Sequence, residues 1–218
     1  MQLLPIPFIG IAVLLLVRAE FRSKERQIYF LKPLSTILVI LVAALSFLEP
    51  NVNTGYSTGI LAGLLLSFGG DMSLIFSSTK AFMAGLILFL LAHVAYTVTF
   101  TLFNGFYPAD LFSGIMLLAM GTLIYRYLEP NLGKMKIPVI IYIGIICLMV
   151  NRAVSTLFGT AFTPAQAWLI TTGATLFWIS DLILAVNRFR QPLKYHRISL
   201  AFYYSGQLCI ALSTTLLK

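Results

Sequence analysis

The chain has 218 residues, of which 59% are hydrophobic and only 10% are charged, and its mean hydropathy is +0.93. Soluble globular domains carry about 25% charged residues, so this composition excludes a soluble globule and indicates an integral membrane protein. The net charge of +8 does not indicate a nucleic-acid partner, because basic residues of a membrane protein gather in its cytoplasmic loops.

Apolar runs follow one another along the whole chain, each about as long as the roughly 20 residues that a helix needs to cross a membrane. Eight such runs lie near 4–21, 29–48, 56–76, 80–103, 109–128, 137–157, 165–186 and 198–217. The links between them are short and are often marked by Pro, Gly or Asn. The first run has no basic segment before it, so we expect a retained helix rather than a signal peptide. The sequence predicts an all-α membrane protein with eight transmembrane helices in a single integral membrane domain, 1–218.

The basic residues are divided unevenly between the two sets of links. Of the 15 Lys and Arg residues, 13 lie in or beside the links after the first, third, fifth and seventh runs. Only Arg152 and Lys218 lie elsewhere. Since basic residues mark the cytoplasmic side, we expect both termini to be non-cytoplasmic. The short loops favour a multi-pass protein of a bacterial inner membrane.

The two halves of the chain share a pattern. A shift of 110 positions places Gly63 over Gly173 and Asp71 over Asp181, and a shift of 104 aligns further residues such as Arg22 and Arg126. The sequence therefore predicts a tandem duplication. Its halves are about 1–108 and 109–218. Because each half has four helices, both enter the membrane in the same orientation and are related by an axis along the membrane normal.

Asp71 and Asp181 are the candidate catalytic residues. An acid inside a lipid-spanning helix costs on the order of 2.5–3.5 kcal/mol, so it normally faces inward and is functional. Equivalent places in two halves predict one shared site near the cytoplasmic ends of their helices. The sequence has no metal-site or cofactor-binding motif, and we expect neither a metal nor a cofactor. Paired carboxyls are typical of acid–base catalysis, although each acid can instead pair with a basic residue that holds the bundle together.

Other polar residues inside the apolar runs are candidates for substrate binding. These are Lys32, His93, Asn151, Arg152, Tyr203 and Gln207. Lys32 either anchors its helix at the interface or binds an anionic headgroup. His93 is either functional or a hydrogen-bonded helix contact. Arg152 needs a partner wherever it lies, in the bundle or at its outer boundary.

Short segments that occur in order along the chain carry a family resemblance. They are Lys32-Pro33-Leu34, Gly63 with Gly70-Asp71-Met72, Phe89 with His93 and Tyr96, Asn151-Arg152, Gly173 with Ser180-Asp181, and Tyr203-Tyr204 with Gly206-Gln207. This ordered set resembles the YhhN family, that of the TMEM86-like lysoplasmalogenases. The resemblance implies an intramembrane hydrolase that cleaves the vinyl ether bond of lysoplasmalogen, a lysophospholipid, among membrane lipids and without a cofactor. The products are a fatty aldehyde and a glycerophospho-ethanolamine or -choline.

Vinyl ether hydrolysis is chemistry that two carboxyls can perform. Protonation of the β-carbon gives an oxocarbenium ion, water attacks it, and the hemiacetal collapses to aldehyde and alcohol. One carboxyl supplies the proton, and the other stabilises the cation and takes a proton from water. Two other functions stay open. Parallel repeats with buried ionisable residues also occur in small transporters or lipid-binding proteins, and a bundle with paired charges can be purely structural.

Overall fold

The computed structural model describes residues 3–215, and these form a bundle of eight α-helices. The helices are α1 (Ile6–Phe21), α2 (Glu25–Leu45), α3 (Thr54–Ile75), α4 (Thr79–Asn104), α5 (Ala109–Leu128), α6 (Lys136–Ser155), α7 (Pro164–Phe189) and α8 (Ser199–Leu212). Four short 3-10 turns lie in the links: Ser46–Leu48, Glu129–Asn131, Gly133–Met135 and His196–Ile198. The prediction of an all-α protein with eight helices is therefore confirmed within the described chain.

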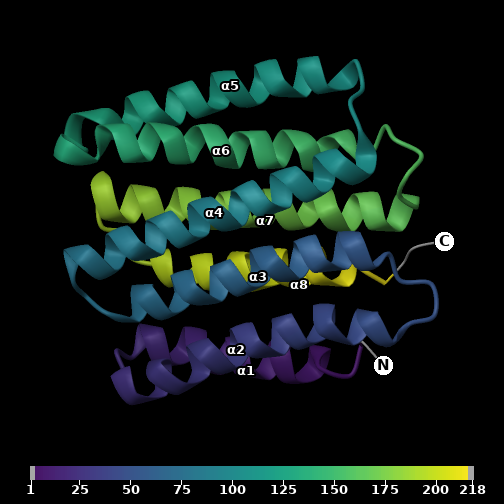
Figure 1. Cartoon of the computed structure of the whole chain (residues 1–218). Coiled ribbons are helices and arrows are strands. Elements are labelled where there is room, and N and C mark those ends of the chain that lie inside the picture. Colours follow the sequence, from purple (N-terminus) through teal and green to yellow (C-terminus); the bar gives the residue numbers. More distant parts are fainter. Residues whose placement is uncertain (1–2, 216–218) are drawn as a thin grey trace.

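The helices lie side by side along one direction, so the links gather at two ends (Figure 1). The basic end holds the links 22–24, 76–78, 129–135 and 190–198. The terminal end holds the links 46–53, 105–108 and 156–163, and the described chain begins and ends there (Figure 1). The predicted alternation of the chain between two sides is thus present in the bundle.

Capping residues set the beginnings of several helices. Asn53 and Ser78 accept hydrogen bonds from the backbone N–H groups of Tyr56 and Ala81, at the first turns of α3 and α4. Thr163 and Gln166 form a reciprocal capping box before α7, whose first residue is a proline. These caps satisfy N–H groups that would otherwise lack partners, so the helices that carry the two acids begin at defined positions.

Six helices are long and apolar enough to cross a membrane: α2 to α7. The other two are shorter, with 16 residues in α1 and 14 in α8. The last apolar run was predicted over 198–217, but α8 ends at Leu212. Its predicted final residues 216–217, and Lys218 of the charge pattern, lie outside the described residues. The structure therefore supports a multi-pass membrane protein with six clear spans.

Packing brings helices from the two halves of the chain together. Within the halves, α3 packs on α4 and α7 packs on α8. Between the halves, α2 contacts α8 and α4 contacts α6. At the α7–α8 contact, a methyl group on Gly173 would lie 2.8 Å from the Gly206 carbonyl oxygen, and one on Gly206 would lie 2.7 Å from that of Gly173. Only glycine permits this approach, which brings α8 and its tyrosines against the centre of the bundle.

Candidate active site

Asp71 lies on α3 and is surrounded by donors from α2 and α8. Its Oδ2 atom accepts hydrogen bonds from the hydroxyls of Thr36 and Tyr203, both at 2.7 Å. The Lys32 ammonium lies 3.7 Å from Oδ1. The side chain of Asp71 is 3% exposed, so this carboxyl is buried among polar partners rather than in hydrocarbon.

Asp181 lies on α7 and has partners on α4 and α6. Its Oδ2 atom accepts a hydrogen bond from the Tyr142 hydroxyl at 2.6 Å, and His93 Nε2 lies 3.1 Å from the same oxygen. The ring nitrogen of His93 also lies 3.0 Å from the Tyr142 hydroxyl, so the three groups form a closed triangle. The side chain of Asp181 is 14% exposed, more than that of Asp71, and part of it is open to a cavity.

The two acids have partners in equivalent places. Each contacts a hydroxyl from the second helix of its own half, Thr36 on α2 or Tyr142 on α6. Each also contacts the last helix of the other half, because Tyr203 on α8 binds Asp71 and His93 on α4 binds Asp181. In the sequence, Tyr203 follows His93 by the same 110 positions that separate the two acids. This cross-bonding ties the two halves together at the acids.

Both carboxyls line one polar cavity of about 300 Å³ that opens toward the basic end. Cationic side chains share its wall with the acids, namely Lys32, Arg188 and Arg197. The sequence expectation of a single site for the two acids thus matches their placement in this cavity. With Glu20 also in its wall, the cavity has three carboxyls and three cationic groups, which suits a substrate with charged and hydrogen-bonding parts.

A second, apolar cavity of about 70 Å³ adjoins the polar one between α4, α5, α6 and α7. Phe82, Phe89, Asp181 and Leu184 line both cavities, so Asp181 lies where the polar space meets the apolar space. Another polar cavity of about 340 Å³, the outer cavity, shares Glu20, Lys32 and Arg197 with the polar cavity that holds the two acids. The three spaces form a series that runs from apolar to charged.

Aromatic rings separate the two acid clusters. The Phe177 ring centroid lies 4.6 Å from that of His93 and 5.1 Å from that of Tyr203, with edge-to-face geometry in both pairs. Phe89 packs on Phe177 and on Tyr203 at 6.0 and 5.8 Å. These contacts fix the orientations of His93 and Tyr203, one partner of each acid.

Comparison with known proteins gives a consistent family. The sequence profile of the YhhN family matches residues 27–214. The chain belongs to the YhhN family. It is 34% identical to the lysoplasmalogenase TMEM86A of Bos taurus, over 81% of this chain and 72% of the relative. It is 33% identical to the human lysoplasmalogenase TMEM86B, over 87% and 77% of the two chains.

A bacterial relative covers more of both chains. The uncharacterized membrane protein YhhN of Escherichia coli O157:H7 is 27% identical over 90% of this chain and 91% of its own. No solved structure matches. The family assignment therefore rests on sequence, and the apolar helices independently agree with a multi-pass membrane protein.

The other residues predicted to bind substrate divide into three groups in this YhhN chain. Lys32 and Tyr203 line the polar cavity. His93 and Gln207 are buried behind its wall, where Gln207 accepts a hydrogen bond from Tyr96 at 2.8 Å and lies 3.4 Å from the Tyr203 hydroxyl. Both side chains contact groups that line the cavity, Asp181 and Tyr203 respectively.

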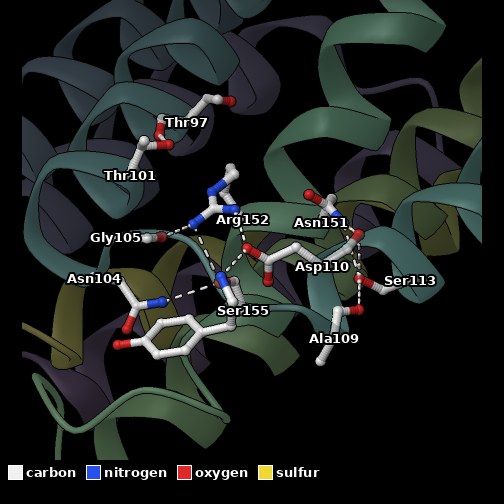
Figure 2. Close-up of polar contacts among 11 residues, drawn as sticks. Thr97, Thr101, Asn104, Gly105, Ala109, Asp110, Ser113, Asn151, Arg152 and Ser155 are labelled. Carbon is white, nitrogen blue, oxygen red and sulfur yellow. Dashed lines mark hydrogen bonds and ion pairs between the residues drawn. The ribbon is translucent and has the colours of Figure 1, made fainter.

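Asn151 and Arg152 form the third group and lie in the last turns of α6, near the terminal end. Figure 2 shows their polar contacts. Arg152 donates to Asp110 at 2.6 Å, to Ser155 at 3.1 Å and to the Gly105 carbonyl oxygen. Asn151 donates to the Asp110 carbonyl oxygen at 2.9 Å and to Ser113 at 2.8 Å. Both side chains thus bind the α4–α5 link and the start of α5 to α6, and neither lines the polar cavity.

Two hydroxyls that bind the acids were not among the sequence candidates, Thr36 and Tyr142. Thr36 lies one helical turn after Lys32, so the same helix face offered a signal. Tyr142 has no such signal, because a tyrosine in an apolar helix is common. Within residues 3–215, no group of three His, Cys, Asp or Glu side chains is placed to hold a metal ion.

Proposed function

We propose that the protein is a lysoplasmalogenase-like hydrolase that cleaves the vinyl ether bond of a lysoplasmalogen or related lysolipid. The carrying observation is that Asp71 and Asp181 line one polar cavity adjoining an apolar one, and Asp181 lies at the junction. Relatives named lysoplasmalogenase, about one third identical over most of the chain, support the reaction class.

The series of cavities gives an amphipathic substrate one orientation. The part of the hydrocarbon chain next to the vinyl ether enters the apolar cavity, so the vinyl ether lies near Asp181. The glycerol then passes Asp71, and the phosphate reaches Lys32. Within the described chain, the Lys32 ammonium contacts one acceptor, Asp71 Oδ1 at 3.7 Å, which leaves N–H groups available for an anion.

The two carboxyls divide the work of catalysis. A protonated carboxyl transfers its proton to the β-carbon of the vinyl ether, and the electrons of the double bond form the new C–H bond. The oxocarbenium ion that results is stabilised by the ionised carboxylate, which then takes a proton from the attacking water. The hemiacetal breaks its C–O bond, giving the aldehyde and the free hydroxyl of the glycerophospho product. Acid–base catalysis of this kind contributes roughly 10²–10⁴-fold.

The experiment that tests this proposal uses the purified protein in detergent with a lysoplasmalogen. We expect release of a fatty aldehyde, and no release from the saturated ether analogue, which has no double bond to protonate. Uptake of the lysolipid into vesicles without aldehyde release would favour a transporter or carrier instead.

We also propose that all eight helices lie in the membrane as a tandem duplication, with both termini non-cytoplasmic. The motivation is the distribution of basic residues and the equivalent partners of the two acids. Reporter fusions after Lys80 and Arg190 should report the cytoplasm, and those after Asn51 and Asn104 the other side. A reversal at any of these sites would refute this orientation.

A further inference from the structure

An ion pair crosses the mouth of the polar cavity. Glu20, at the end of α1, lies 2.7 Å from Arg197 in the link before α8. The side chain of Glu20 is only 9% exposed, whereas that of Arg197 is 41% exposed. Both residues line the polar cavity that holds the acids and also the outer cavity of about 340 Å³. Lys32 lines the same two cavities.

Any anion that enters this mouth competes with Glu20 for Arg197. A phosphate attracts both Lys32 and Arg197, since a guanidinium binds phosphate oxygens in a bidentate manner. Once Arg197 turns to the phosphate, the Glu20 carboxylate is left buried without its cation. A buried charge that loses its partner is strongly unfavourable. A ligand that brings its own cation avoids this penalty.

We infer that Glu20 selects zwitterionic headgroups: Arg197 and Lys32 bind the phosphate, and Glu20 exchanges Arg197 for the ammonium group of the same headgroup. This inference rests on the proposed function and adds the recognition of the headgroup. The exchange replaces one ion pair by two and leaves no charge unpaired. A headgroup with a phosphate but no amine leaves Glu20 without a partner and is disfavoured.

The outer cavity has room and suitable chemistry for the ammonium group. Glu25 lies in its wall with the rings of Tyr29 and Phe76, whose centroids are 6.2 Å apart. Aromatic faces attract quaternary as well as primary ammonium groups, so choline and ethanolamine both suit this space.

The test measures binding of two saturated-ether lysolipids, which cannot be cleaved, one with a phosphoethanolamine and one with a methyl phosphate headgroup. The wild-type protein should bind the ethanolamine analogue about tenfold more tightly, as expected for one charge-assisted contact. Glu20→Gln should reduce this preference to about twofold or less. Glu129→Gln is the matched control, because Glu129 pairs with Lys136 at 3.2 Å at the same end and lines neither polar cavity. It should keep the preference.

Retention of the full preference by folded Glu20→Gln would overturn the inference, as would equal binding of both analogues by the wild type. If Glu20→Gln does not fold, Arg197→Gln decides the question. This variant should weaken the binding of both analogues, because the contact to the phosphate is lost. It should keep or raise the preference for the ethanolamine analogue, because Glu20 then lacks the cation of Arg197. A preference that disappears in Arg197→Gln refutes the role of Glu20. Binding is measured without turnover. A wild-type protein that cleaves lysoplasmalogen but binds both analogues equally therefore refutes only this inference and leaves the proposed function standing.

Discussion

The two ends of the bundle each bury a pair of opposite charges, and the pairs differ in what surrounds them. At the terminal end, both terminal nitrogens of Arg152 bind protein oxygens, and its guanidinium lies 4.4 Å from the Phe106 ring centroid. At the basic end, the Lys32 ammonium contacts Asp71 at 3.7 Å and faces a cavity. Burial of charge is common to both. Open polar groups beside a cavity distinguish the candidate site from the Arg152–Asp110 pair.

The largest expected effect is the loss of turnover when either acid at the basic end is changed. Asp71→Asn and Asp181→Asn keep the side-chain volume and remove the titrating proton, so each should reduce turnover by at least about 100-fold. The double variant should be hardly worse than either single one, because the acids act as a unit. Initial rates of aldehyde release, measured on monodisperse protein, give the answer.

Asp110→Asn is the matched control from the terminal end. It removes a carboxylate that, like Asp71, pairs with a basic side chain, here Arg152. It should leave turnover per folded molecule within about twofold, because Asp110 does not line the polar cavity. More than about a tenth of wild-type turnover in either folded Asn variant at the basic end would contradict the catalytic pair. The acids would then have the structural role that Asp110 has.

Sequence reasoning located most of the fold, because apolar run length alone defines helices in a membrane protein. For example, the run predicted over 80–103 agrees within one residue at each end with α4, which spans Thr79–Asn104. Sequence reasoning failed at the end of α8, where contacts with other helices end the helix before the apolar run ends. Ser213 bonds to the Tyr56 hydroxyl at 2.7 Å and its carbonyl oxygen accepts from Gln166 at 2.9 Å, so α8 ends within an apolar run.

The candidate site was only partly predictable. Asp71 and Asp181 were identified because carboxyls are rare in apolar runs, and their shared cavity followed from their equivalent positions. The interpretation of Arg152 as a substrate-binding residue could not be tested by sequence, since its partner Asp110 lies on another helix. Tyr142 was missed because a hydroxyl becomes informative only when its acceptor is known.

A second prediction concerns stability at the terminal end. Arg152→Met should lower the free energy of unfolding by about 3 kcal/mol, because it removes a buried guanidinium and leaves the partly buried Asp110 carboxylate without its cation. Turnover per folded molecule should change little. Thermal unfolding in detergent measures the first quantity, and aldehyde release normalised to folded protein measures the second.

A loss of turnover in Arg152→Met without loss of stability would break the contrast between the two ends. In that case the network in Figure 2 would act on the site through α6, which carries both Arg152 and Tyr142.

A third, smaller effect is expected for Lys32. Lys32→Met should raise the apparent KM about tenfold with a smaller change in kcat, because a charge-assisted contact to the phosphate is lost. Lys136→Met removes an exposed cation at the same end and should leave both constants unchanged. An unchanged KM with a large fall in kcat would show that Lys32 acts only through Asp71.

The smallest expected effects distinguish the two acid clusters from each other. Tyr142→Phe and Tyr203→Phe each remove one hydroxyl that donates to an acid, at 2.6 and 2.7 Å respectively. One such hydrogen bond contributes about 1 kcal/mol, so each variant should reduce kcat roughly three- to tenfold. Tyr56→Phe is the control, because its hydroxyl bonds to Ser213 at the terminal end, and it should alter stability without altering kcat. Since each tyrosine donates one short hydrogen bond to its acid, similar losses are expected. If one variant kept full activity while the other lost it, the two acids would not share the reaction equally, and the cluster without an effect would have only a supporting role.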